Sequence, residues 1–183
     1  DETIVRMPFE VRHMGSKYPI FSFDFTGAKR GVLPASYDYL RLEGRMQYRL
    51  NLPPIGYSQL MLEGGKIFGK VPYLLLKLHE GNGTYFYDRY AFSCMNFYEF
   101  SSDAWISFFY EHHFNGFLLG RVPLLKKLNW REVFVFKGVY GTLSARNDGS
   151  LPNTKAVMLF PVGMSSVEHP YLETGFGIEN IFR

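Results

Sequence analysis

The stretch from Tyr37 to Leu50, YDYLRLEGRMQYRL, decides the fold of this chain. From Leu40 onward its even positions are apolar, aromatic or glycine, whereas its odd positions carry the polar and charged side chains. Successive side chains of a β-strand point to opposite faces, so this pattern predicts a strand with one apolar and one ionic face. Its length is more than twice the about five or six residues of an ordinary globular strand. The charges on its ionic face form what we call the charged ladder: Arg41, Glu43, Arg45 and Arg49.

Two architectures accommodate such a strand. A soluble sheet would place the ladder in water and the leucines in a core. An outer-membrane barrel would place the leucines in lipid and the ladder in its lumen, where mixed charges can pair with each other and with an inserted loop. The strand alone leaves both interpretations open.

Six further extended segments are predicted, and no segment longer than a turn or two has helical periodicity. The predicted strands are Tyr18–Thr26, Ile55–Phe68, Tyr87–Phe97, Ala104–Asn115, Trp130–Leu143 and Tyr171–Phe182. The fold class is therefore all-β. The links near 51–54, 99–103 and 118–129 are compact, and those near 27–36, 69–84 and 144–169 are long. Alternating short and long connections are typical of antiparallel transmembrane β-barrels, which favours the membrane interpretation.

The composition agrees with a barrel wall. The chain has 183 residues with 18 Phe, 13 Tyr and 2 Trp, and aromatic side chains border the lipid-facing band of membrane barrels. Its 20 basic and 17 acidic residues nearly balance, which predicts no nucleic-acid partner. The longest apolar stretches, such as Val71–Leu76, fall far short of the about 20 residues that a spanning helix needs.

One short amphipathic turn interrupts the strands. In Val122–Leu128 the leucines are at positions 124, 125 and 128, with Lys126 and Lys127 between them. Such a turn suits a membrane surface, and a loop that caps a soluble core is the equally weighted alternative.

The sequence offers little for catalysis. On a strand, Glu111 and His113 would point the same way about 7 Å apart, as a polar pair facing the lumen; a metal would need a third ligand that the sequence does not identify. The single Cys94 is expected to be a small buried side chain within a strand. No nucleophile motif or dinucleotide fingerprint is present. We expect a non-enzymatic protein without cofactor or metal.

Four motifs in fixed order resemble a known family. They are Phe92–Phe100, Glu111–Gly116, Val122–Leu128 and Gly175–Phe182. Together they resemble the C-terminal outer-membrane β-barrel of the Bacteroidota carboxypeptidase-regulatory-domain-like family of uncharacterised proteins. That barrel is similar to those of the BamA/surface-antigen superfamily, whose members insert or translocate proteins. The carboxypeptidase-like part of the family name describes a non-catalytic fold.

The resemblance implies further features. Gly81, Asn82 and Gly83, with Thr84, would form a loop folded into the lumen. The chain, 1–183, would be a single barrel segment of about seven strands, incomplete at both ends and without the family's N-terminal immunoglobulin-like domain. It would lie in the bacterial outer membrane, with lipid and possibly client or accessory outer-membrane proteins as partners. The alternative is a soluble periplasmic β-sandwich or β-clam that binds a lipid or glycan through its aromatic side chains.

Overall fold

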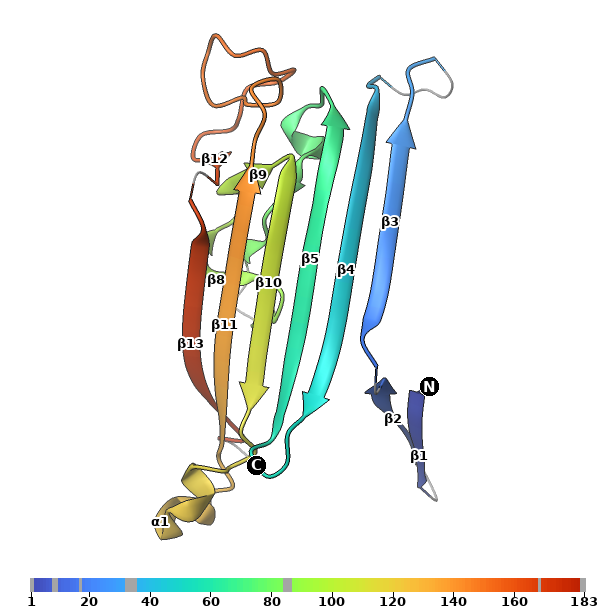
Figure 1. Ribbon diagram of the computed structural model, residues 1–183. Coiled ribbons are helices and arrows are strands. Elements are labelled where there is room, and N and C mark those ends of the chain that lie inside the picture. Colours follow the sequence, from blue (N-terminus) through green and yellow to red (C-terminus); the bar gives the residue numbers. More distant parts are fainter. Residues whose placement is uncertain are drawn as a thin grey trace.

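The protein is built around one antiparallel sheet of six long strands (Figure 1). The computed structural model describes residues 2–7, 10–16, 18–31, 36–83, 87–167 and 169–181. In spatial order the strands are β13 (Tyr171–Glu179), β11 (Arg131–Thr142), β10 (Ala104–His113), β5 (Tyr57–Gly69), β4 (Tyr39–Asn51) and β3 (Ile20–Ala28). A separate hairpin of β1 (Glu2–Met7) and β2 (Glu10–Ser16) precedes them. The all-β, antiparallel expectation is confirmed.

The predicted alternation sets the register of the sheet. Arg45 of β4 lies opposite Glu63 of β5, which in turn lies opposite Ser107 of β10. The predicted strands match the observed ones to within a few residues at most ends. Thr84, beside the predicted inward loop, and Phe182, at the end of a predicted strand, lie outside the described residues.

The predicted segment Tyr87–Phe97 contains a strand, Phe92–Asn96, but this strand is not part of the main sheet, so its predicted place among the long strands is wrong. It belongs to residues 70–103, which connect neighbours β5 and β10 and which we call the insertion. The elements of the insertion are η1 (Tyr73–Leu75), β6 (Lys77–Leu78), β7 (Gly81–Asn82), β8 (Phe92–Asn96) and β9 (Phe100–Ser102). The chain turns at Asp88, whose Oδ1 accepts a hydrogen bond from the backbone N–H of Tyr90 at 2.9 Å. It turns again after β8, at Tyr98, which has a φ of 60°.

The connections differ between the two ends of the sheet (Figure 1). The β3–β4 connection, the insertion and the connection 143–170, which contains β12 (Ser165–Ser166), begin at one end. At the other end, residues 52–56 join β4 to β5, and residues 114–130 join β10 to β11 with two short helices. At that end the backbone of Gly56, with φ of 104°, approaches His113 so closely that a Cβ would lie 1.8 Å from the His113 carbonyl oxygen.

The core lies on the face of the sheet that carries the charges. Met61, Phe109 and Val139 of this face pack against Phe92 and Met95 of the insertion. Nearer the end where the insertion begins, Ile67 and Trp105 pack with Val71 and Leu76. We call this side, which also carries Arg45, Glu63, Glu111, Lys137 and Glu173, the charged face.

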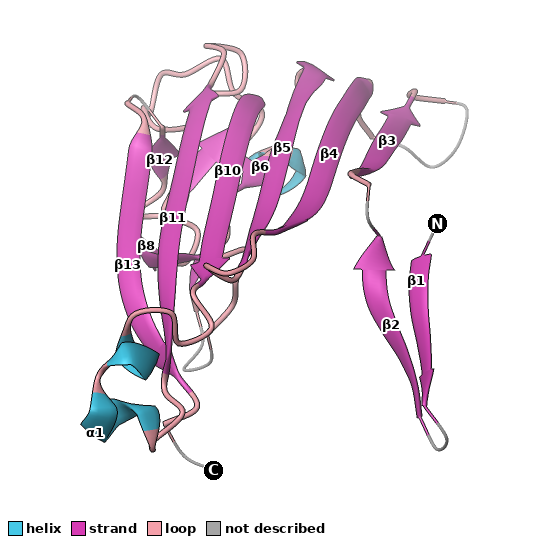
Figure 2. Cartoon of the chain, turned by 60° about the horizontal axis from the view of Figure 1, so that its bottom comes forward, coloured by secondary structure: helices cyan, strands magenta, loops and turns pink. Residues whose placement is uncertain are grey.

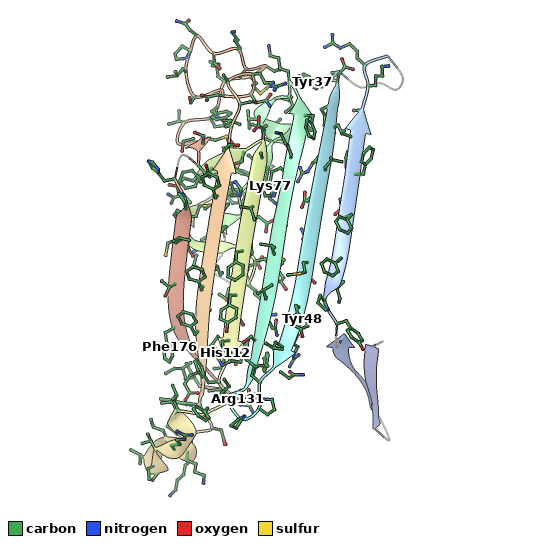
Figure 3. All side chains as sticks on the ribbon, in the orientation of Figure 1. Tyr37, Tyr48, Lys77, His112, Arg131 and Phe176 are labelled. Atoms are coloured by element: carbon green, nitrogen blue, oxygen red, sulfur yellow. The ribbon has the colours of Figure 1, made fainter. Side chains whose placement is uncertain are left out.

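The opposite side, which we call the apolar face, has no layer packed over it within the described residues, except at one end, where residues 52–56 and 114–130 cover His112 and Glu132. It carries Leu42, Leu62, Ile106, Tyr140 and Phe176, and its only charged side chains are Lys66 and Glu132, at opposite ends. Phe23 is 83% exposed, Phe176 65% and Ile106 50%. In Figure 3 the labelled Tyr48 and Phe176 belong to this face, and the rings and aliphatic chains around them stand free of other elements.

The sheet does not close on itself within the described part of the chain. β3 and β13 are its two edges, and no described strand pairs with their outer sides. The expectation of a closed β-barrel therefore goes beyond what these strands establish, and the chain is an open antiparallel sheet with one covered face (Figure 2).

Candidate functional site: an insertion held against the charged face

The charged ladder is an ion-pair network. Arg41 contacts Glu43 at 2.6 Å, and Arg45 contacts Glu43 at 3.6 Å and Glu63 at 2.8 Å. Since Arg45 and Glu63 are opposite in register, the alternation of two neighbouring strands is sufficient to bring them together. Three of the four predicted ladder residues thus meet through Glu43 and Glu63.

Arg49, the fourth ladder residue, lies apart from this network. Its guanidinium stacks over the ring of Tyr57, 4.1 Å from the ring centre. The contact is a cation–π interaction at the end of the sheet rather than an ion pair.

The insertion joins the ladder through Lys77. Its Nζ lies 2.5 Å from Oε1 of Glu63, and the indole N–H of Trp105 donates to the same oxygen at 3.3 Å. The Glu63 side chain is only 5% exposed. A buried carboxylate without partners is energetically unfavourable. Because Lys77 of the insertion is one of the partners of Glu63, this ion pair holds the insertion against the sheet.

A second attachment involves Glu111 of β10. Its Oε2 accepts hydrogen bonds from the Tyr87 hydroxyl at 3.0 Å and from Nε of Arg89 at 3.1 Å. Arg89 also donates to the side-chain oxygen of Gln59 on β5. Burial, with the Glu111 charge adding to it, raises the pKa of the Tyr87 hydroxyl, which therefore stays protonated and able to donate.

His113 extends this cluster to β13. Its Nε2 lies 2.6 Å from Oε1 of Glu111, its Nδ1 lies 3.2 Å from Oε2 of Glu179, and its ring stacks on Tyr57. The predicted pair Glu111 and His113 is thus in contact, and Glu179 is the third group that the sequence left unidentified. Ligand atoms of the three lie within 4.8 Å of one another. The two ring nitrogens face different carboxylates, and Arg89 adds a positive charge, so the geometry is that of an imidazole bridging two acids.

A third attachment holds β8. Lys137 of β11 is 1% exposed, and its Nζ donates to the backbone oxygens of Asp88, at 3.2 Å, and Ala91. Glu173 of β13 accepts from the backbone N–H groups of Ser93 at 2.8 Å and Cys94 at 2.7 Å. Sequence reasoning missed both residues. The available signal was Lys137 itself, the only charge between Val133 and Ala145, on the same parity as the valines.

β8 also corrects the expectation for Cys94. Phe92 and Met95 are each 1% exposed, whereas the thiol of Cys94 is exposed. The buried positions are three residues apart, so Cys94 faces away from the core. Cys94 instead lines a hollow between β8 and the charged face, together with Lys137 and Glu173.

The predicted inward loop Gly81, Asn82 and Gly83 is one part of the insertion. β7 pairs with β8 in parallel, and a Cβ on Gly81 would lie 2.2 Å from the backbone oxygen of Asn96. Glycine is thus required for this close approach of two backbones.

His79, two residues before Gly81, is 2% exposed and bonds through Nε2 to the Ser102 hydroxyl at 2.9 Å. Burial, helped by nearby Lys77, lowers the pKa of His79 to about 4, so the ring is neutral.

Asn147, in the connection 143–170, closes the end of the site where the insertion begins. Its side-chain oxygen accepts from the backbone N–H of Val71 at 3.0 Å. Its amide nitrogen donates to the carbonyl of Gly69 and to Asp103, each at 3.2 Å. Both ends of the insertion are therefore fixed by one buried side chain.

Comparisons with known proteins place the chain at family level. No helix among the described residues has both the length and the apolar character that crossing a membrane requires. No curated protein and no solved structure matches the chain. A family model described as "Family of unknown function (DUF5686) C-terminal domain" matches residues 3–145, and the chain belongs to this family.

Proposed function

We propose that this chain forms part of the wall of a bacterial outer-membrane β-barrel. In this arrangement the apolar face contacts lipid, the charged face looks into the lumen, and the insertion fills the lumen beside it. The role is non-enzymatic and needs no cofactor. The resemblance of four motifs to BamA-like Bacteroidota barrels supports protein insertion or translocation as the task, with client or accessory outer-membrane proteins as partners.

The observation that carries the proposal is the inverted character of the sheet. Its charged face is covered by the insertion over β5, β10 and β11, whereas its apolar face is open over most of the six strands. Soluble monomers rarely expose a contiguous apolar patch of more than a few hundred Å². In lipid, an exposed apolar surface is not unfavourable. The same environment explains why the charged side chains of this face, Lys66 and Glu132, lie near its two ends.

Strand length agrees with the same environment. β4 and β5 each contain 13 residues. At about 3.4 Å per residue and a tilt of about 45°, such a strand covers roughly 30 Å, which is the thickness of a hydrocarbon core. The outer edges of β3 and β13 would need pairing partners there, since a bilayer does not solvate free backbone groups.

Spin-label accessibility tests the proposal. In the full-length protein in native outer membranes, with Cys94→Ser as background, labels are placed singly at Leu42, Ile106 and Phe176. Arg146, exposed in the connection 143–170, serves as the water-facing reference. We expect the first three labels to collide with oxygen and to avoid a water-soluble nickel reagent, and the reference label to do the reverse.

Two results would overturn this proposal. Labels at Leu42 and Ile106 that are immobile and shielded from both reagents would indicate a second protein layer, as in the β-sandwich or β-clam alternative. Recovery of the protein in the soluble fraction without detergent, with no heat-modifiable migration on a gel, would contradict it independently.

A further inference from the structure

The connection between β10 and β11 is a second place where apolar side chains are exposed. Residues 114–130, which we call the tip, extend past the end of the sheet and contain η2 (Leu119–Arg121) and α1 (Pro123–Lys126) (Figures 1 and 2). The tip lies at the opposite end from where the insertion begins, and it takes no part in the contacts described above.

Four aliphatic side chains of the tip face outward. Leu124 is 77% exposed, and Leu118, Val122 and Leu128 are each between 44% and 47% exposed. They lie within eleven residues of chain, at the same end of the sheet as the exposed Ile178 of the apolar face. The tip therefore continues the apolar surface beyond the strands.

The charge of the tip has one sign. It carries Arg121, Lys126 and Lys127, and no acidic residue occurs from Phe114 to Trp130. Within the described residues none of the three basic groups forms an ion pair, and the guanidinium of Arg121 stacks over the ring of Phe117, 4.0 Å from the ring centre. Three free cations beside four exposed aliphatic chains are what an anionic bilayer surface attracts.

The base of the tip is held firmly to the sheet. Glu132, 1% exposed, accepts the backbone N–H of Leu119, and its own carbonyl accepts the N–H of Phe114 at 2.9 Å. The side-chain amide of Asn180 donates to the carbonyl of Asn129 at 3.4 Å. The cations are thus presented at a fixed level relative to the strands.

We propose that the tip binds the headgroups of anionic phospholipids at the boundary of the bilayer. Arg121, Lys126 and Lys127 contact lipid phosphates, while Leu124 and its aliphatic neighbours enter the acyl region. Trp130, at the junction of tip and strand, lies at the level where indole rings favour the interface. This inference depends on the proposed wall function, because the sheet sets the depth of the tip.

Quenching of Trp130 by brominated lipid tests the inference. The full-length protein is reconstituted in mixed bilayers of phosphatidylglycerol and phosphatidylcholine, with one of the two lipids brominated at a time. Trp105, the other tryptophan, is 5% exposed within the core, and a Trp130→Phe variant measures its residual signal. We expect several-fold preferential quenching by brominated phosphatidylglycerol at low salt, since about fivefold per cation corresponds to about 1 kcal/mol.

Matched triple variants identify the source of the preference. Arg121→Gln with Lys126→Gln and Lys127→Gln should abolish it while leaving quenching by brominated phosphatidylcholine in place. Lys29→Gln with Arg146→Gln and Lys155→Gln removes the same charge at the other end of the sheet and should leave the preference intact. Heat-modifiable migration of both variants checks that they fold.

The outcomes separate the two proposals. Equal quenching by both lipids in the wild type, or a preference that survives in the tip variant, would overturn lipid binding by the tip. If neither lipid quenches Trp130 while labels at Leu42 and Ile106 still lie in lipid, the tip inference fails and the wall proposal stands. If those labels avoid lipid as well, both fail.

Discussion

Glu63 receives four donors from three sources. The guanidinium of Arg45, through Nε at 3.2 Å and the other nitrogen at 2.8 Å, the amine of Lys77 and the indole of Trp105 all reach its two oxygens. With the carboxylate 5% exposed, the loss of its charge leaves Lys77 with no counter-charge in a poorly hydrated place.

Glu63→Gln should therefore destabilise the protein by about 2–4 kcal/mol. Arg49→Gln, which removes a ladder charge that stacks only on Tyr57, should cost less than about 1 kcal/mol. The free energy of unfolding by urea in detergent measures both. Equal effects of the two substitutions would contradict the special position of Glu63.

His79 adds a dependence on pH. Burial holds the pKa of His79 at about 4 in the folded protein, while in the unfolded chain it is about 6.5. The unfolded state therefore binds the proton first as the pH falls, and stability is lost between about pH 6.5 and pH 4, by up to about 3 kcal/mol.

The His79→Gln variant isolates this contribution. Glutamine can still bond to the Ser102 hydroxyl but does not titrate, so the loss of stability between pH 7.5 and pH 4.5 should be smaller by about 2–3 kcal/mol than in the wild type. An identical loss in both proteins would show that His79 is not buried as a neutral ring.

Among the elements, β8 depends on the sheet more than on its own partner. It has five residues and pairs irregularly with the two-residue β7, whereas Glu173 accepts two of its backbone N–H groups. A strand this short is not stable alone, so its order comes from β11 and β13.

Glu173→Ala should consequently release β8. Two N–H groups lose their acceptor, and we expect the protection of Ser93 and Cys94 against hydrogen exchange to fall by about tenfold or more, since about 1.4 kcal/mol is a factor of ten. Glu179→Ala, on the same strand but bonded to His113, is the control and should leave this protection unchanged. Similar protection in all three proteins would rule out Glu173 as the anchor.

Element types and the two-faced character of the strands could be predicted from alternation, as β4 and β10 show. Alternation could not place Tyr87–Phe97, because an extended segment packed on a face has the same composition as one paired within the sheet. It also could not predict that Lys77, Arg89 and Glu173 meet partners far away in sequence. Those contacts depend on how the insertion folds back, which no local pattern records.

For the molecule as a whole, the sequence pattern predicts that the sheet has one apolar and one charged face. It does not predict which of the two faces carries the core. The pattern of β4 is compatible with leucines inside and arginines outside. The fold places the core on the charged side instead, because residues 70–103 supply Phe92, Met95 and Leu76 there. Charged side chains can occupy a covered face there because each of Glu63, Glu111 and Lys137 finds partners on the insertion.

The insertion begins and ends on adjacent, hydrogen-bonded strands. Lys66 of β5 already lies opposite Ala104 of β10, so a tight turn of a few residues could join the two strands in place of the 34-residue excursion. The pairing of β5 with β10 therefore does not depend on which segment connects them. Evolution could lengthen, shorten or exchange this segment, and with it the chemistry of the covered face, without changing a single hydrogen bond between the strands of the sheet.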